Sequence, residues 1–324
     1  MSSSTDKRSD APLDPFPVRR VASVRARPDD QKWLVEGLWL ASGVGFLAGG
    51  PKLGKTHLAV EIAVAVAAKD KVLGHPARIS GPVLFYGAED HLADLRQRFE
   101  GLTTMRGLDI DRLAVDLLDV PSLRLEREDD LLRLRATVER SKPRLLVLDP
   151  FIRIARIDEN SAQDVSTILS ELRALQRDFG VAVLVVHHTR KSPAAHPNLT
   201  MRGSSDFAAW SDSNLLLTRR RDSLTLTIEH RSAPAPQPIA CRLLAEPVPH
   251  LAPDLDLREH PPPADPLEAD ILRLLTAARR PLTTVDLRAQ LRRRKADVAA
   301  ALSSLQGQGH VQRDLLGWAL PRSD

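Results

Sequence analysis

The stretch that decides the fold reads Gly49-Gly50-Pro51-Lys52-Leu53-Gly54-Lys55-Thr56 and is followed by His57. It matches G-x-x-x-x-G-K-[ST], follows the apolar run Val44–Ala48 and opens a helical pattern. Glycines in this motif let backbone N–H groups point at phosphate oxygens, and the helix N-terminus adds partial positive charge. We expect all nine residues to bind a nucleotide, with Lys55 on the β- and γ-phosphates and Thr56 on Mg²⁺.

Outward from this motif, short apolar runs alternate with helical patterns, which predicts an α/β domain over residues 31–244 with a mostly parallel sheet. The expected strands are Val44–Ala48, Val83–Tyr86, Leu145–Leu148, Val181–Val186, Ser213–Leu217 and Leu224–Ile228. The expected helices are Thr56–Ala68, Ala88–Leu102, Asp129–Ser141 and Ser161–Phe179. The third and fourth runs are apolar throughout and suit central strands, and the last two suit an antiparallel hairpin at the sheet edge.

Acidic residues follow two of these runs. Asp149 comes directly after Leu145–Leu148, at the carboxyl end of a buried strand where such sheets bind ligands, and we expect it to hold Mg²⁺, partly through water. Glu89 and Asp90 come shortly after the run Val83–Tyr86. This run is expected to be a strand next to Val44–Ala48, the strand that precedes the glycine-rich motif, or P-loop. Glu89 is the expected general base and Asp90 the alternative. A helix-capping role for Asp90, with Glu89 in the first turn, also stays open.

Two histidines, His187 and His188, end the run Val181–Val186. We expect His188 to contact the γ-phosphate from the tip of a central strand, and a structural role is the alternative. Because adjacent strand residues point to opposite faces, the pair is not expected to share a metal ion.

The segments GGPKLGKT, FYGAED, LLVLDPF and VVHHTRK, in this order, resemble the RecA-like ATPase superfamily. With Met201–Ser205 and Asp212–Leu215, the chain is most similar to the RepA-like hexameric helicases of plasmids and mobile elements, over residues 33–240. The resemblance implies a RecA-like P-loop NTPase core that uses ATP and Mg²⁺. The roles it implies are Walker A for Lys55 and Thr56, catalytic glutamate for Glu89, Walker B for Asp149 and γ-phosphate sensor for His188.

Relatives of this kind form rings with ATP between neighbouring subunits, so the resemblance implies a homo-oligomer, and a hexamer above all. Each neighbour supplies an arginine finger that stabilises charge on the transferring phosphoryl group. Arg231 occupies the corresponding position here, although Glu229 stands where a lysine is frequent. Arg219, Arg220 and Arg221 are the alternatives.

The segment Thr189–Ser204 corresponds to the loop that faces the ring channel in these relatives. It contains Arg190, Lys191 and Arg202 and no acidic residue, so we expect it to contact the phosphates of single-stranded DNA. An ordinary basic surface loop is the alternative.

Recurring prolines predict a linker over residues 245–265. Beyond it, three helical patterns (Pro266–Ala278, Thr283–Leu291 and Lys295–Gly307) and a small hairpin outline a winged helix-turn-helix domain over residues 266–324. That region has ten basic and six acidic residues, a net of +4 that equals the whole chain's. The duplex DNA contacts expected there are Arg292, Arg293, Arg294 and Lys295. A helical interaction module with a solvated basic cap is the alternative.

The single cysteine, Cys241, excludes an intramolecular disulfide and fits a reducing cytosol. Residues 1–30 are polar and mixed in charge, which predicts a disordered tail rather than a secretory signal. The small-apolar stretch Leu58–Ala68 is interrupted by Glu61 and is too short to span a bilayer, so we expect a cytoplasmic protein without membrane contact.

These features favour an ATPase that acts as a DNA helicase in plasmid or mobile-element replication. One alternative is a DNA-dependent recombination or repair ATPase that does not unwind duplexes. The other is an ATP-switched regulator that binds DNA through the C-terminal winged helix.

Overall fold

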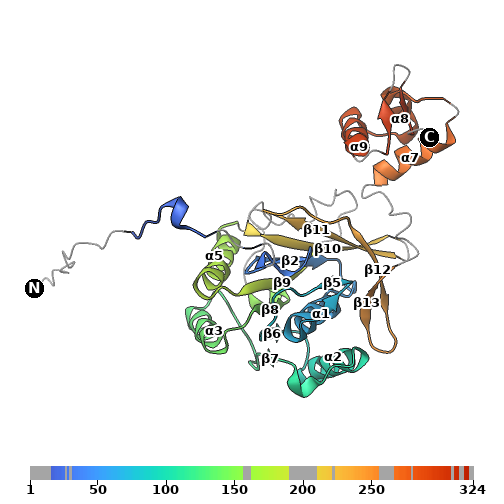
Figure 1. The fold of residues 1–324 in the computed structure, drawn as a ribbon. Helices are drawn as coiled ribbons and strands as arrows, with labels where there is room; N and C mark the ends of the chain where they lie inside the picture. The colour runs from blue at the N-terminus through green and yellow to red at the C-terminus, as the bar shows by residue number, and fades with distance from the viewer. Residues whose placement is uncertain are drawn as a thin grey trace, which may run out of the picture.

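The computed structural model describes residues 16–25, 28, 31–155, 162–189, 210–220, 223–254, 266–278, 280–307, 310–313 and 317–320. Within them, the chain forms an α/β core around a nine-stranded sheet, and a smaller helical body near the C-terminus (Figure 1). The predicted fold class, α/β with a mostly parallel central sheet, is confirmed.

The spatial order of the sheet places the P-loop strand near its middle. From one side of the sheet to the other, the strands are β13 (His250–Pro253), β12 (Ile239–Leu244), β11 (Ser223–His230), β10 (Ser213–Arg220), β3 (Val44–Gly49), β9 (Ala182–His188), β8 (Leu145–Asp149), β6 (Val83–Gly87) and β7 (Val115–Leu117). Strands β10, β3, β9, β8, β6 and β7 are parallel, whereas β11, β12 and β13 continue the sheet as antiparallel neighbours.

Helices cover both faces of this sheet. On one face lie α1 (Lys55–Ala68) and α2 (Leu92–Met105), and on the other α3 (Glu128–Ser141), α4 (Phe151–Ile154) and α5 (Ala162–Phe179) (Figure 1). The strands β3, β8 and β9 are buried on both faces, except for His188 at the tip of β9, which explains their unbroken apolar runs. Helix α1 carries apolar residues around most of its surface because the sheet, β13 and α2 all pack against it.

The remaining short elements of the described residues lie outside the nine-stranded sheet. They include the one-turn 3-10 helices η1 (Val21–Ser23) and η3 (Ile110–Arg112), and the short antiparallel pairs β1 (Trp33–Val35) with β2 (Trp39–Leu40) and β4 (Lys71–Val72) with β5 (His75–Pro76).

Four expectations about the core are wrong. The strands β10 and β11 do form the predicted hairpin, but β12 and β13 extend the sheet beyond it, so the hairpin is not at the edge. The sheet therefore continues past residue 244, into residues expected to be a linker. The cause is that Cys241 of β12 and Leu251 of β13 are buried in the same apolar core as α1, and this burial outweighs the prolines between the two strands.

The strand β6 is not beside the P-loop strand, because β9 and β8 lie between them. Helix α2 also begins at Leu92 rather than Ala88. The Ala88 N–H donates to the Asp149 carbonyl (2.7 Å), and Asp90 is held by Arg98, so this stretch stays outside the helix.

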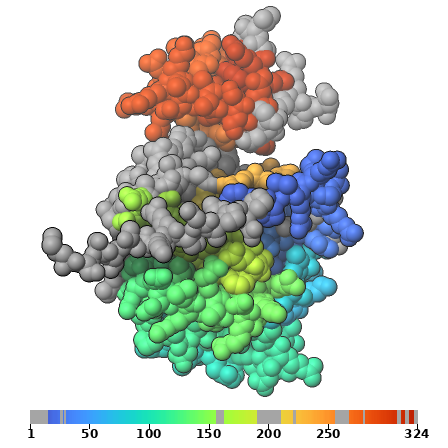
Figure 2. Space-filling model, turned by 90° about the vertical axis from the view of Figure 1, so that its left-hand side faces the viewer, coloured from blue at the N-terminus to red at the C-terminus, as the bar shows by residue number. Residues whose placement is uncertain are grey.

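The C-terminal body consists of α7 (Pro266–Ala277), α8 (Thr284–Leu291), α9 (Lys295–Gly307) and the two-stranded pair β14 (Gln312–Arg313) and β15 (Trp318–Ala319). Figure 2 shows it, orange to red, as a rounded body. It has its own apolar core, in which Ile271, Leu287, Val298 and Leu302 are buried. The Trp318 indole N–H donates to the Thr284 hydroxyl (3.2 Å), which ties β15 to the start of α8.

Of the expected N-terminal tail, the structure describes residues 16–25 and 28, which are all exposed; the remainder lies outside the described residues. Among the described helices, none combines the length and apolar character that a membrane crossing requires.

Candidate nucleotide site

The P-loop leaves the carboxyl end of β3 and runs directly into α1. Two glycines are required by their surroundings. A Cβ on Gly49 would lie 2.6 Å from the Leu217 carbonyl oxygen of the neighbouring strand, and Gly54 has a φ of +88° at the N-cap of α1. Leu53 is buried and anchors the loop, whereas Pro51 and Lys52 are exposed at its outer turn.

Lys55 lies under this loop and is only 4% exposed. Its ammonium donates to the Gly50 carbonyl (2.7 Å), which holds the side chain across the loop. Burial lowers the pKa of Lys55 to about 8, against the opposing charges of Asp149 and Glu89. The loop therefore holds a partly desolvated cation whose interaction with phosphate would be strong.

Thr56 and Asp149 meet beside this lysine. The Thr56 hydroxyl donates to Asp149 Oδ2 (2.7 Å), and Asp149 is 6% exposed. Burial raises the pKa of Asp149 to about 6, although the Thr56 hydrogen bond opposes the shift. A hydroxyl and a carboxylate are oxygen ligands of the kind Mg²⁺ prefers, together with phosphates and water. These two residues therefore fit the cation that such a loop requires.

Glu89 follows the end of β6, at the edge of the sheet where the parallel strands end, which we call the P-loop edge. Its charge acts on both Lys55 and Asp149. The Arg153 Nε donates to Glu89 Oε1 (2.7 Å) from the short helix α4. Asp90 instead forms a two-pronged ion pair with Arg98, at 2.8 and 3.0 Å. The capping alternative for Asp90 is wrong, because α2 has His91 at its N-cap and no side-chain cap there.

The two histidines at the end of β9 have different surroundings. His188 is exposed and pairs in register with Gly49, so it lies next to the P-loop. Burial and the nearby Lys55 lower its pKa. His187 is buried edge-on against Phe46 and Phe151, and burial lowers its pKa to about 4. His187 therefore acts as a neutral core residue, and His188 is the histidine at the site.

Arg231 lies at the opposite edge of the sheet, which is the edge where the parallel strands begin. Its neighbour His230 contacts the Ser213 hydroxyl and the Gly37 carbonyl, both at 3.0 Å, at the start of β10. Since Gly49 pairs with Leu217, the P-loop begins roughly 13 Å further along the same strand direction. Arg231 is half exposed and makes a long contact with Asp212 (3.9 Å), so it does not reach its own P-loop.

Of the alternative finger residues, Arg219 is exposed near the P-loop edge of β10, two residues beyond Leu217. The side chain of Arg220 and all of Arg221 lie outside the described residues.

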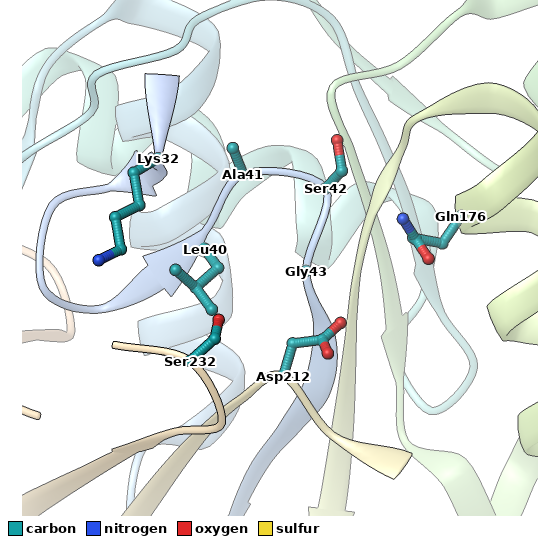
Figure 3. Close-up of a pocket in the computed structure, with 8 residues that line it drawn as sticks. All are labelled: Lys32, Leu40, Ala41, Ser42, Gly43, Gln176, Asp212 and Ser232. Carbon is teal, nitrogen blue, oxygen red and sulfur yellow. The ribbon is translucent and has the colours of Figure 1, made fainter. Parts of the chain in front are cut away.

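A pocket of about 460 Å³ opens at this opposite edge and is lined by Asp212 and Ser232 among others (Figure 3). Asp212, Ser42 and Gln176 point into it from three segments that are far apart in the sequence. A second pocket of about 420 Å³ lies next to Glu89 and is lined by residues that follow β6 and β7. The larger pocket is therefore remote from the P-loop, and the chemistry of the site does not depend on it.

The expected DNA contacts are only partly described. Arg190, Lys191 and Arg202 lie outside the described residues. Arg292, Arg293 and Arg294 form the exposed turn between α8 and α9, and Lys295 is the first residue of α9. These four basic side chains are therefore contiguous on the surface of the C-terminal body.

Two features of the site were not predicted from the sequence. One is Arg153, which follows Asp149 by four residues and is turned back to Glu89 by α4. The other is the hairpin of β12 and β13, which packs beside α1 near Gly54. Neither has a sequence pattern that distinguishes it from an ordinary surface arginine or a proline-rich connector.

A family model described as AAA domain matches residues 10–194, more than half of the chain, and the chain therefore belongs to this family. The RadB recombinase structure is similar over 65% of this chain and 90% of its own, with 16% identity and a TM-score of 0.49. A KaiC-like protein from the archaeon Pyrococcus horikoshii OT3 is similar over 74% of this chain and 100% of its own, with 18% identity and a TM-score of 0.47.

The family and the site together define a P-loop ATPase. The order of the parallel strands and the position of the P-loop after β3 give it the RecA-like core that the motifs predicted.

Proposed function

We propose that this protein hydrolyses ATP to move along DNA, as a ring-forming helicase of the RepA-like type in plasmid or mobile-element replication. The observation that carries the proposal is the convergence of Lys55, Thr56, Asp149 and Glu89 at one edge of the sheet. The order of these motifs in the chain, together with the exposed basic residues, favours DNA as the partner.

In the proposed reaction, the phosphates of ATP lie on the backbone of the P-loop. Lys55 leaves the Gly50 carbonyl and neutralises the β- and γ-phosphates. Thr56 and Asp149 would hold Mg²⁺, which supplies charge neutralisation when bound. Glu89 orients the attacking water and accepts its proton, and His188 contacts the γ-phosphate from the end of β9. The products are ADP and phosphate.

We propose that Arg231 acts as the arginine finger in the ATP site of a neighbouring subunit. Its position at the edge opposite the P-loop supports this, because a head-to-tail contact brings one edge of a subunit against the other edge of the next. Head-to-tail contacts form a ring when the rotation between successive subunits closes, and we propose a ring of six subunits.

DNA contact is assigned to two basic regions. Arg190, Lys191 and Arg202 would follow the phosphates of a single strand in the channel, and the turn Arg292–Lys295 would contact duplex DNA from a winged helix. The capped helix α8, the exposed turn and the tied β15 support the winged-helix interpretation.

A forked DNA duplex tests the proposal. We expect single-stranded DNA to stimulate hydrolysis and ATP to drive strand separation, with Lys55→Ala inactive in both assays. Stimulated hydrolysis without strand separation would favour a recombination or repair ATPase. Tight, sequence-specific duplex binding with very slow hydrolysis would favour an ATP-switched regulator. Absence of ATP binding by the unmodified protein would overturn all three functions.

A further inference from the structure

The hairpin of β12 and β13 touches the P-loop itself. Leu243 and Leu251 are cross-strand partners, and a Cβ on Gly54 would lie 3.1 Å from a methyl carbon of each. Gly54 is the residue from which α1 starts. The hairpin therefore borders the helix end where the phosphates of a nucleotide would bind (Figure 1).

Buried polar contacts fix the hairpin in this place. The Leu251 N–H donates to Glu61 Oε1 on α1 (2.7 Å), and Arg106 donates to Glu61 Oε2 (3.0 Å). Glu61 is 2% exposed, so this carboxylate is enclosed between α1, α2 and β13. Val248, in the turn, packs so close to Gly101 of α2 that a Cβ there would lie 2.6 Å from it. The hairpin is thus a fixed wall beside α1.

The two leucines of this wall differ in exposure. Leu251 is 2% exposed, whereas Leu243 is 36% exposed and carries apolar surface next to the P-loop. Across the first turn of α1, the charges of Arg98, Asp90 and His250 all act on His57. The first turn therefore lies between the start of α2 and the hairpin, with an apolar side chain on the hairpin side.

We propose that Leu243 packs against the base of the bound nucleotide, which makes it a residue that recognises the nucleoside rather than the phosphates. The inference rests on the proposed ATPase function. With the phosphates on the P-loop, we place the base beside the first turn of α1, where the hairpin presents the exposed part of Leu243. An aromatic base that covers the exposed part of Leu243 gains hydrophobic contact without a hydrogen bond.

The test compares ATP with inorganic tripolyphosphate, which carries the phosphates but no base. Binding to the full-length protein is measured by calorimetry for the unmodified chain, Leu243→Ala and Leu244→Ala. Leu244 is the matched control, because it is 39% exposed and its side chain points to the other face of β12. We expect Leu243→Ala to weaken ATP binding about fivefold and to leave tripolyphosphate binding unchanged, while Leu244→Ala changes neither.

Two results would overturn the inference while leaving the ATPase intact. In one, the unmodified protein and Leu243→Ala bind ATP equally. In the other, Leu243→Ala weakens both ligands alike, which would mean that Leu243 only supports Gly54. If the unmodified protein binds neither ligand, the proposed function itself fails. Thermal unfolding of each variant, with a midpoint close to that of the unmodified protein, shows that the hairpin has kept its fold.

Discussion

The two edges of the central sheet differ in how their charged groups are satisfied. At the P-loop edge, Lys55 and Asp149 are buried, and burial moves the pKa of each toward neutrality. At the opposite edge, Asp212 accepts hydrogen bonds from Arg173 and from the Val44 N–H, and Arg231 remains half exposed beside it.

This difference indicates which edge carries out chemistry. A buried charge that lacks some of its hydrogen-bond or ion-pair partners destabilises the protein, and such charges are typical of sites where a ligand supplies the missing partners. Charges that are fully paired within the protein instead stabilise the fold. The P-loop edge thus has the character of an incomplete catalytic site. The opposite edge is structurally complete and presents Arg231 outward.

The largest effect is expected when the two edges are inactivated on different subunits. Arg231→Ala is expected to lower kcat by about 10³-fold or more, the scale of an arginine finger. Glu89→Gln is expected to be nearly inactive as well. When the two variants are mixed, steady-state assays should show recovered hydrolysis, because about one site in four then combines an intact Glu89 with an intact Arg231.

Arg219→Ala is the matched control, since Arg219 lies near the P-loop edge of its own subunit. A large loss of kcat in Arg219→Ala, together with no recovery of hydrolysis in the mixture that contains Arg231→Ala, would assign the arginine finger to Arg219. The opposite edge would then have no role in catalysis.

Within the P-loop edge, Glu89→Gln is expected to lower kcat about 10²- to 10⁴-fold with little change in nucleotide affinity, because a general base acts on water and not on the phosphates. Single-turnover hydrolysis and a separate binding titration measure the two effects. Asp90→Asn should cost far less, since Asp90 is engaged by Arg98. Equal losses in both variants would contradict the choice of Glu89.

A smaller effect is expected from pH. Burial lowers the pKa of Lys55 to about 8, so its positive charge is lost as the pH rises through that value. Nucleotide affinity, measured without Mg²⁺, should therefore fall by up to about tenfold per pH unit as the pH rises above 8. Lys55→Arg, which stays charged, should abolish the decline. A decline of the same size in that variant would show that another group titrates.

The smallest effect concerns stability at the opposite edge. Asp212→Asn removes the charge that holds Arg173 and is expected to lower the free energy of unfolding by about 1–3 kcal/mol. Urea denaturation measures the change. Arg231→Ala should leave the free energy of unfolding nearly unaltered, because its contact with Asp212 is long and exposed. A large destabilisation by Arg231→Ala would make this arginine structural.

The local parts of this protein follow from the sequence alone. The P-loop, Asp149 and the unbroken runs of β8 and β9 are contiguous, and each requirement on them is set by backbone conformation or by burial on both faces. For the same reason the helices and strands of the C-terminal body were placed within a few residues of their observed ends.

Which of these parts meet depends on strand order and on packing between distant segments. Strand order separates β6 from β3, brings Arg153 to Glu89 and places Arg231 at the edge opposite its own P-loop. Residues 245–265 were expected to be a linker because prolines recur through them, yet β13 lies within this range, and it forms a hairpin with β12. These two strands form a wall beside Gly54 because the apolar contacts and the Glu61 hydrogen bond that hold them come from segments almost 200 residues away.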